Sequence, residues 1–474
     1  MWTGDEMAQA ERAGTGWADL FRGGRAPLVI ALTLGVWLHA ADNLLIVTTL
    51  PSAVAEIGGD AWVPWAFTLY MLATIMVSAM TGLIALSFGL RRAFIIAGTL
   101  FAAGCVVSAL ASDMAVMLVG RFIQGMGGGG QVALVYITLD RMFPKAMMPK
   151  LVALVSAVWS MSAFCGPLVG GLFASHGMWR GAFWAFALQA VLFVVLVAAT
   201  VDRDRRDGKP ETAGGIPVVR LALLAAGILL VSLAAVDPEP VIAPAMMVAS
   251  AAVFALFLWR DGRAGDHRML PPRPFSTATL YGSGLLFAVL LTTATASFST
   301  YGPFFLERLF GLTPLESGYV IAIESLAWGV VAVTVANVGL GTERWLIRSA
   351  PVLAAAALVG LAVTMPFGRV WLIVPFVVLL GACFGQMWGL VIRRVTEAAP
   401  PADRERTAAA IPTVQELGYV LGVALCGVIA NALGFAGDAP EETLRTISVW
   451  VFAAFVPLAV AAVWPAWRMS RKQS

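Results

Sequence analysis

Apolar runs of about 20 residues, separated by charged or Pro- and Gly-rich breaks, follow one another from residue 27 to residue 466. A helix of that length crosses the roughly 30 Å hydrocarbon core of a bilayer. Charged residues make up only 12% of the 474 residues, against 59% hydrophobic, whereas a soluble domain carries about 25% charged residues. No β-barrel alternation is visible, so only helices can satisfy every backbone polar group in lipid. The sequence therefore predicts an all-α membrane protein.

The breaks divide the chain into about fourteen predicted transmembrane helices. Each run begins or ends where a charged residue or a Pro/Gly cluster interrupts it. The approximate spans are residues 27–50, 62–85, 93–111, 114–138, 149–174, 182–201, 216–236, 241–259, 277–305, 314–339, 348–366, 370–392, 407–433 and 444–466.

Lysine and arginine are distributed unevenly between the two sides of the membrane. If the N-terminus is cytoplasmic, most of these residues fall in inside connections, and the outside connections hold only Arg180, Arg308, Arg369 and Arg445. The positive-inside rule then places both termini in the cytoplasm of a multi-pass protein, which we expect in the inner (plasma) membrane. The net charge of +3 follows from this loop asymmetry and gives no reason to expect a nucleic-acid partner.

Two long polar connections divide the predicted spans into groups. Residues 202–215 and 260–276 bracket two spans that lack Asp, Glu, His, Asn and Gln. We therefore predict two six-helix halves joined through an inserted helical hairpin, a layout in which the halves commonly enclose a central substrate site. The predicted parts are a cytoplasmic segment at 1–26, a first half at 27–201, a linker with two helices at 202–276, a second half at 277–466 and a cytoplasmic tail at 467–474.

A carboxylate interrupts the first apolar run. Asp42 lies in the stretch from His39 to Pro51, and a charge inside a membrane helix costs about 2.5–3.5 kcal/mol unless it faces the bundle interior or water. His39, three residues earlier, falls on the same helix face, so the pair is the candidate proton-coupling point of a membrane transporter. Arg121, in the fourth run, lies at a depth similar to that of Asp42. The two charges can exchange partners, as proton coupling needs, or form a static pair that only orders the fold.

Short motifs follow one another in a specific order and spacing. Asp42 precedes Leu50-Pro51, and the stretches Arg121-x-x-Gln124-Gly125, Gly166-Pro167-x-x-Gly170-Gly171 and Trp179-Arg180-x-x-Phe183 come after it. In the second part, Gly311-Leu-Thr-Pro-Leu-Glu-Ser-Gly318 and the run from Gln415 to Leu425 continue the likeness. Together these motifs resemble the major facilitator superfamily, in particular its fourteen-span drug/proton antiporters.

The resemblance implies alternating access of the two halves, with a hydrophobic or cationic compound exported as protons enter. It implies that Asp42 is the protonatable residue, that Arg121 modulates it, and that Gly166 and Pro167 form the bend associated with antiport. The sequence supports that bend independently, because proline removes a helix hydrogen bond. Gly170 and Gly171 allow close packing of a neighbouring helix.

The first inside connection departs from the superfamily pattern. The family's stretch reads like Gly-x-Leu-Ala-Asp-Arg-x-Gly-Arg-Arg, whereas here it is Gly82-Leu-Ile-Ala-Leu-Ser-Phe-Gly-Leu-Arg-Arg92. Gly82, Gly89, Arg91 and Arg92 are the candidate conformational residues, and Leu86 and Ser87 occupy the Asp and Arg positions. In the family that carboxylate helps to latch the two halves on the inside. This departure keeps a second hypothesis open, namely transport of a lipid, siderophore or other natural product on the same fold.

Two further carboxylates, Glu324 and Glu416, fall near the middle of their spans, where they either act in coupling or hold neighbouring helices together. Aromatic and amide side chains at similar depths could line an amphipathic cavity, although each could equally pack in the core or face lipid. These candidate substrate-binding residues are Tyr70, Tyr136, Trp159, Phe298, Tyr301, Trp328, Gln386 and Trp388.

Other functional classes find little support. The three histidines, His39, His176 and His267, are scattered, and neither an HExxH metal site nor a GxxxxGK[ST] phosphate loop occurs. The four cysteines show no paired spacing. We therefore expect no metal, no cofactor and no enzymatic activity, and we regard a receptor or membrane enzyme as a remote alternative. The expected driving force is the proton gradient, and the expected state is a monomer in the lipid bilayer.

Overall fold

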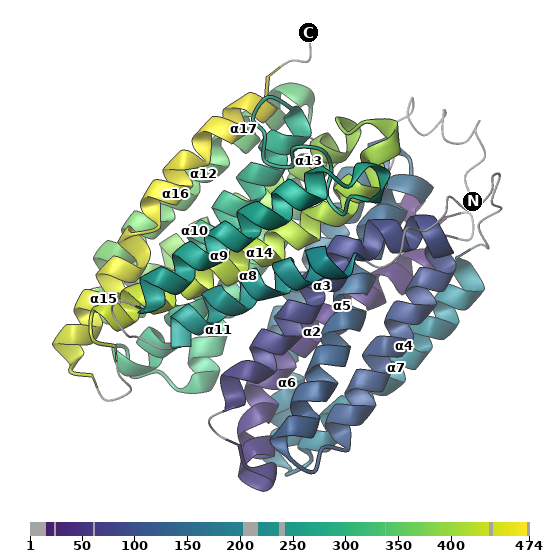
Figure 1. The fold of residues 1–474 in the computed structure, drawn as a ribbon. Helices are drawn as coiled ribbons and strands as arrows, with labels where there is room; N and C mark the ends of the chain where they lie inside the picture. The colour runs from purple at the N-terminus through teal and green to yellow at the C-terminus, as the bar shows by residue number, and fades with distance from the viewer. Residues whose placement is uncertain are drawn as a thin grey trace. The chain divides into compact units, whose positions relative to one another are not determined.

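The computed structural model describes residues 16–22, 25–59, 62–201, 217–236, 242–336, 338–435 and 439–471. Every regular element in these ranges is a helix (Figure 1), which confirms the predicted all-α class. The chain groups into two compact units. Unit 1 comprises residues 1–217, 264–271 and 400–413, and unit 2 comprises residues 218–263, 272–399 and 414–474. The predicted division into two six-helix halves and an inserted hairpin stays a prediction.

Unit 1 is built mainly from six long helices. Its elements are η1 (Trp17–Leu20), α2 (Ala26–Ile57), α3 (Val63–Phe88), α4 (Leu90–Ala109), α5 (Met114–Met142), η3 (Lys145–Met147), α6 (Met148–Ser175), α7 (Trp179–Thr200), η4 (Gly265–His267) and η6 (Pro401–Asp403). Gly89 separates α3 from α4 with a φ of 78°, a conformation that glycine adopts without strain.

Unit 2 contains the remaining helices. They are α8 (Val218–Val236), α9 (Ile242–Gly262), α10 (Leu280–Arg308), α11 (Pro314–Val335), α12 (Leu340–Thr364), η5 (Met365–Phe367), α13 (Val370–Glu397), α14 (Arg404–Ala432), α15 (Glu441–Ala453), α16 (Val456–Ala461) and α17 (Val463–Met469). The first residues of α14, up to Thr413, group with unit 1.

Eleven helical segments among the described residues are long and apolar enough to cross a membrane, by length and composition. This finding confirms a multi-pass membrane protein. The described part of α8 contains a shorter apolar stretch, Val218–Ala234. Helices α2 and α5, of 32 and 29 residues, are also long enough to span a bilayer.

Helix α12 starts earlier than we predicted. The span was placed at residues 348–366, but α12 begins at Leu340. The additional turns carry Glu343, whose side chain is fully buried and forms ion pairs with both Arg393 and Arg394 of α13. An internal partner offsets the cost of burying the carboxylate, so a charged residue need not mark the helix end.

The last predicted span, residues 444–466, is three consecutive helices. Helix α15 ends at Ala453, four residues before Pro457, and α16 ends at Ala461, four residues before Pro465. Proline has no N–H for the carbonyl four residues earlier, and its ring clashes with that carbonyl. The run as a whole, Glu441–Met469, is nevertheless long and apolar enough to count as one membrane span, as predicted.

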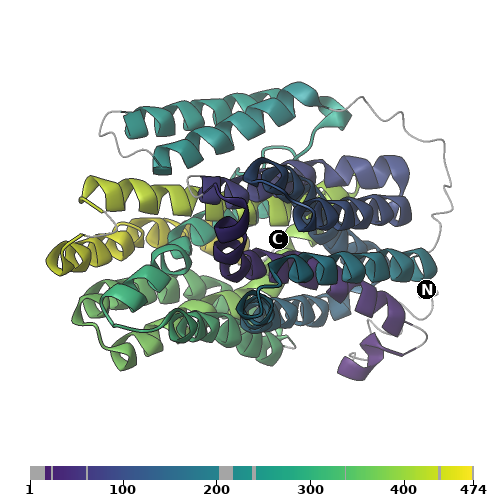
Figure 2. The same cartoon turned by 90° about the horizontal axis from the view of Figure 1, so that it is seen from below.

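Helices α8 and α9 pack along each other, as the teal pair in Figure 2 shows. The Oγ of Ser250 on α9 donates to the carbonyl oxygen of Gly227 on α8 over 2.7 Å. Near one end of the pair, the Nη1 of Arg220 lies 2.7 Å from the Oδ1 of Asp261. Arg220 is the one charged residue in the predicted span 216–236, and it is therefore paired with a carboxylate just beyond the next apolar run.

Candidate functional site

Unit 1 contains a buried charged cluster between α2 and α5. The Nη1 of Arg121 donates to the Oδ2 of Asp42 over 2.5 Å, and neither side chain has exposed surface. The Nε2 of Gln124 donates to the other carboxylate oxygen over 3.1 Å. The pairing of Asp42 with Arg121 that their matched depth suggested is thus present.

Gln124 extends the cluster to α4, a role that we did not predict. Its Oε1 accepts a hydrogen bond from the Oγ of Ser108 at 3.0 Å and from the Nη1 of Arg121 at 3.4 Å. Its Nε2 also lies 3.2 Å from the Sγ of Cys105. The position of Gln124 three residues after Arg121, on the same helix face, was the signal that could have identified it.

Tyr70 of α3 connects the charged cluster to His39. The guanidinium carbon of Arg121 lies 4.2 Å from the centre of the Tyr70 ring, and the hydroxyl of Tyr70 lies 2.9 Å from the Nδ1 of His39. The His39 ring also meets the edge of Trp159 from α6, with the ring centres 5.7 Å apart. Four of the predicted residues, His39, Tyr70, Arg121 and Trp159, therefore form one contact chain that begins at Asp42.

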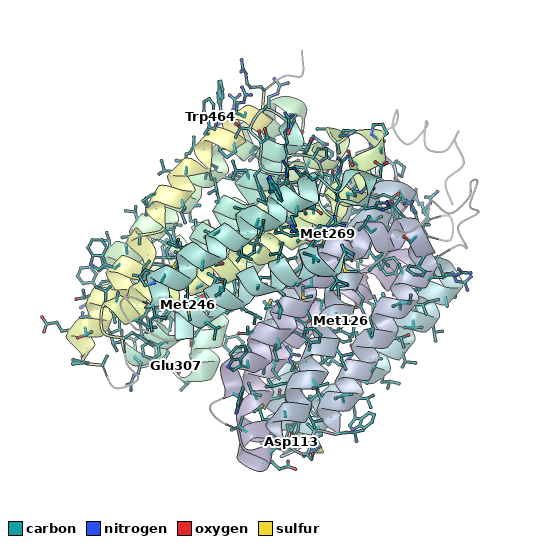
Figure 3. The ribbon with its side chains drawn as sticks, in the orientation of Figure 1. Asp113, Met126, Met246, Met269, Glu307 and Trp464 are labelled. Atoms are coloured by element: carbon teal, nitrogen blue, oxygen red, sulfur yellow. The ribbon has the colours of Figure 1, made fainter. Side chains whose placement is uncertain are left out.

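Glycines on α5 allow this close assembly. A Cβ at Gly125 would lie 2.2 Å from the carbonyl oxygen of Tyr70, and one at Gly129 would lie 2.3 Å from that of Thr74. A Cβ at Gly128 would lie 2.7 Å from the Nδ1 of His39. Helix α5 therefore approaches α2 and α3 more closely than any larger residue would permit, as small residues do in membrane bundles. In Figure 3, the label Met126 marks the part of α5 that carries these glycines, and the label Asp113 marks the residue that caps the start of α5.

The remaining candidates of unit 1 lie in different places. Tyr136 is buried further along α5. Gly166 and Gly170 are buried within α6, which is continuous from Met148 to Ser175. Pro167 and Gly171 also belong to α6, but their side-chain surroundings lie outside the described part of the structure.

The first inside connection contacts two other segments of unit 1. A Cβ at Gly82 would lie 3.2 Å from the Cα of Arg406, and Arg91 donates to the carbonyl oxygen of Ala198. Arg92 is exposed.

Residues 400–413 of unit 1 hold charge pairs that the sequence analysis missed. The Nε of Arg141 donates to the Oε1 of Glu405 over 2.7 Å. Asp403 accepts from Arg268 at 2.9 Å and from Arg406 at 3.0 Å. The segment whose Arg406 packs against Gly82 therefore carries carboxylates, even though Leu86 replaces the one that the family places in the first inside connection.

A second missed contact involves the motif that begins at Trp179. The Nε1 of Trp179 donates to the Oε2 of Glu56 over 2.7 Å, and Arg180 pairs with the other oxygen of Glu56. Arg180 also donates to the carbonyl oxygen of Ala111 over 2.7 Å. The motif fastens α7 to the end of α2 and to the α4–α5 connection. Sequence spacing gave no sign of Glu56.

In unit 2, three candidates lie near one another on α11 and α13. The rings of Trp328 and Phe384 stack with centres 5.1 Å apart, and Phe384 meets Trp388 at 6.1 Å. Glu324 lies one turn before Trp328 on α11 and is half-buried. Gln386 turns to α12, where its amide donates to the carbonyl oxygen of Leu346 at 3.1 Å and to the Oγ of Ser349 at 3.1 Å.

The other candidates of unit 2 lie on α10 and α14. Phe298 is fully buried, and Tyr301 meets the edge of Phe435 with ring centres 5.3 Å apart. Glu416 is half-buried on α14. Some of the predicted site residues thus contact one another within unit 1 and others within unit 2, and the remaining candidates lie elsewhere in each unit.

Comparison with known proteins gives consistent matches. The family model of the Major Facilitator Superfamily matches residues 32–423. A probable multidrug-efflux transporter of Mycobacterium tuberculosis is 31% identical over 450 residues, which cover 92% of this chain and 92% of that protein. The multidrug efflux pump SdrM of Staphylococcus aureus is 24% identical over 432 residues, covering 89% of this chain and 93% of the pump.

Solved structures show the same fold. The human organic anion transporter MFSD10 superposes with a TM-score of 0.71 at 13% identity, covering 94% of this chain and 100% of that one. The proton:xylose symporter XylE superposes with a TM-score of 0.65 at 16% identity, covering 92% and 94%. At such identities the likeness concerns the fold alone.

Proposed function

The chain belongs to the Major Facilitator Superfamily, and we propose that it is a proton-coupled antiporter that exports hydrophobic or cationic compounds from the cell. It is a membrane transporter and not an enzyme. Multidrug efflux is the activity named for the two bacterial relatives. Export of small molecules is therefore the function that the family membership favours.

Proton coupling rests on the buried pair of Asp42 and Arg121. A carboxylate without exposed surface stays charged in a membrane helix when a cation and a hydrogen-bond donor hold it, and here Arg121 and Gln124 supply both. Protonation of Asp42 removes its charge and leaves Arg121 without its ionic partner. Binding of one proton to Asp42 therefore replaces the ion pair with an unpaired buried cation, Arg121, and this change destabilises the present arrangement of the helices.

The transport cycle follows from that exchange. In the proposed cycle, a proton from outside binds Asp42, and the transporter then changes from the outward-open to the inward-open state. The proton leaves to the cytoplasm when Arg121 pairs with Asp42 again. The substrate crosses in the opposite direction in the return step. Tyr70 and His39 are the side chains through which movement of Arg121 would reach Trp159.

We further propose fourteen spans, with α2, α5 and α8 completing the set of eleven apolar segments. These three helices have 32, 29 and 19 residues. The same proposal includes a layout of two six-helix halves and one hairpin. It places the protein in the plasma membrane as a monomer, with both termini in the cytoplasm. The excess of Lys and Arg in the inside connections supports the orientation.

A lipid, siderophore or other natural product is the second candidate substrate class. It is motivated by Leu86 and Ser87, which stand where the family carries a charged latch. Leu86 is 37% exposed, and the Ser87 hydroxyl donates to the carbonyl oxygen of Leu83 within its own helix. Neither side chain can take part in an ion pair, so the inside end of α3 works differently from that of typical family members.

Proton movement in proteoliposomes tests the main proposal. Ethidium is added to vesicles holding the unaltered protein, Asp42→Asn or Asp113→Asn, and the internal pH is recorded. We expect ethidium-linked proton flux in the unaltered protein and in Asp113→Asn, because Asp113 caps α5 outside the charged cluster and asparagine caps helices equally well. Asp42→Asn should show none.

Loss of flux must be separated from loss of folding, since Asp42→Asn leaves Arg121 buried without its partner. The double variant Asp42→Asn/Arg121→Gln removes both charges and should fold better than the single variant. Coupled flux that persists in the folded double variant would refute proton coupling through this pair. Absence of flux from the unaltered protein, with a lipid or metabolite copurifying, would favour the second substrate class.

A further inference from the structure

Arginines from separate parts of the chain gather at the end of α17. The Nε of Arg348 on α12 donates to the Oγ of Ser470 over 2.7 Å. The Nη1 of Arg394 on α13 donates to the carbonyl oxygen of Met469 over 2.9 Å. These contacts bring the side chains of three helices of unit 2 together. We call the group the arginine cluster, and its members are Arg348, Arg393, Arg394, Arg468 and Arg471.

The arginine cluster carries more positive charge than its helices neutralise. The acidic residues of α12, α13 and α17 are Glu343 and Glu397. Glu343 has no exposed surface and is shared between two members of the cluster, and Glu397 is exposed at the end of α13. Arg468 donates to an uncharged acceptor, the carbonyl oxygen of Thr277, at 3.0 Å and 3.1 Å. An excess of positive charge therefore remains at this end of unit 2.

Exposed tryptophans lie among these arginines. Trp345 precedes Arg348 by three residues on α12 and is exposed. Trp464, labelled in Figure 3, and Trp467 are exposed on α17, and their rings stack with centres 5.6 Å apart. The guanidinium carbon of Arg471 lies 4.8 Å from the centre of the Trp467 ring. Because tryptophan concentrates at the boundary between membrane and water, the arginine cluster lies at the level of the lipid headgroups.

Exposed apolar side chains continue from the cluster along the same helices. Val352, one turn beyond Arg348, and Val359 are exposed on α12. Val460 of α16 and Val463 of α17 are exposed too, and α12 packs against both of these helices. A ligand with a negative headgroup and apolar chains matches this combination of surfaces. A free phosphate ion would contact the arginines but would gain nothing from the apolar surface.

We propose that Arg348, Arg468 and Arg471 form a docking surface for the headgroup of an acidic phospholipid. The planar guanidinium group donates two parallel hydrogen bonds to a phosphate, and basic pockets between membrane helices bind acidic headgroups. Capping of α17 explains Arg394 but does not require the exposed Arg348 and Arg471. The docking surface is independent of the transported substrate. Only its assignment to the cytoplasmic leaflet rests on the proposed orientation.

Native mass spectrometry of the full-length protein in detergent tests the docking surface. The protein is titrated with phosphatidylglycerol or with phosphatidylcholine of the same acyl chains, and the Kd of the first bound lipid is measured. We expect the Kd for phosphatidylglycerol to be about tenfold lower or more, because each arginine near an acidic headgroup strengthens binding about fivefold. Phosphatidylcholine has no net charge and should gain little from the arginines.

Substitutions assign this preference to the arginines. Arg348→Gln/Arg471→Gln should raise the Kd for phosphatidylglycerol about tenfold or more, and Arg348→Lys/Arg471→Lys should keep it within about threefold. Arg471→Gln alone changes an exposed side chain and should raise the Kd about fivefold. Arg308→Gln/Arg369→Gln is the matched control, since these exposed arginines lie at the opposite ends of α10 and α13.

Several results would each overturn the docking surface. One is equal affinity of the unaltered protein for the two lipids. Another is an unchanged Kd in Arg471→Gln and in the double glutamine variant, or an equal loss in the lysine variant or in the control. Displacement of phosphatidylglycerol by inorganic phosphate at equal concentration would indicate an anion site without lipid recognition. Since no transport is measured, failure of the antiport proposal would leave this surface intact, and loss of lipid preference would leave the antiport proposal intact.

Discussion

Arg121 of α5 and Asp42 of α2 form an ion pair over 2.5 Å, although the two residues are 79 positions apart in the sequence. Neither side chain touches solvent in the structure. A buried pair of this kind contributes little net stability when intact, yet removal of one partner leaves an unneutralised charge in a medium that solvates it poorly. Its energetic importance therefore lies in the states where it is broken.

Replacing Asp42 alone should destabilise the protein strongly. We expect Asp42→Asn to lower the unfolding free energy by about 3–5 kcal/mol, because Arg121 stays charged and buried. The double variant Asp42→Asn/Arg121→Gln should recover most of that loss, and Asp113→Asn should lose little. Thermal unfolding in detergent measures all three, and a double variant less stable than Asp42→Asn would contradict this account.

The two contacts of Tyr70 can be separated by substitution. Tyr70→Phe keeps the ring beside Arg121 and removes only the hydroxyl bond to His39, which should cost about 1 kcal/mol. Tyr70→Leu removes the ring as well and should cost about 2 kcal/mol more, since the cation–π contact is desolvated. Chemical unfolding in detergent distinguishes the two variants. Equal losses would mean that the ring does not hold the guanidinium.

Close helix packing makes Gly381 irreplaceable. Gly381→Ala would set a Cβ 1.9 Å from the carbonyl oxygen of Glu324, and a backbone atom cannot turn aside as a flexible side chain can. We expect this variant to give little monodisperse protein in size-exclusion chromatography. Gly318→Ala on α11 is the control, because its added Cβ meets no atom within 4 Å among the described residues outside the backbone of its own helix turn, and alanine favours a helix over glycine by about 1 kcal/mol. Similar yields of the two variants would refute the tight α11–α13 contact.

The cap of α5 should depend on pH. Asp113 accepts from the amide of Val116 over 3.0 Å, and this bond, together with one from Ser112, lowers the pKa of the Asp113 carboxyl below its usual value. A lowered pKa in the folded state means that the stabilisation is present above the unfolded pKa of about 4 and is lost as the pH falls through the folded value. Asp113→Asn carries no titratable group at this position.

Amide hydrogen exchange in the first turn of α5 checks this expectation. Protection at Val116 should fall with acidification in the unaltered protein and change less in Asp113→Asn, once the intrinsic pH dependence of exchange is subtracted. The same pH response in both proteins would show that the carboxylate does not cap the helix as the structure indicates.

Some site contacts could be foreseen from the sequence and others could not. Equal depth from the helix ends pointed to the pairing of Asp42 with Arg121, because depth depends only on counting residues along a helix. Gln124 and Glu56 were not foreseen, since their partners depend on how far each helix is rotated toward its neighbour. His39 lies near Asp42 in sequence, and its ring contacts Tyr70, Trp159 and Asn43.

The helix ends, like the site contacts, could be predicted from the sequence only in part. A charged residue was assumed to end an apolar run, which failed for α12 because Glu343 finds two arginines on α13. A run of apolar residues was assumed to be one helix, which failed between α15 and α17 because Pro457 and Pro465 lie inside it. The first error needed knowledge of a distant partner, whereas the second could have been avoided by giving proline more weight.

The sequence by itself determined that the chain is helical, that it lies in a membrane and that it belongs to its superfamily. These properties follow from the length of apolar runs and from short motifs, which are local and independent of how helices turn toward each other. Only the tertiary structure decided which charges have partners. Asp42 has Arg121 and Gln124, and Glu343 has Arg393 and Arg394. Partnership depends on helix rotation and close approach at glycines, and neither can be read from a single helix.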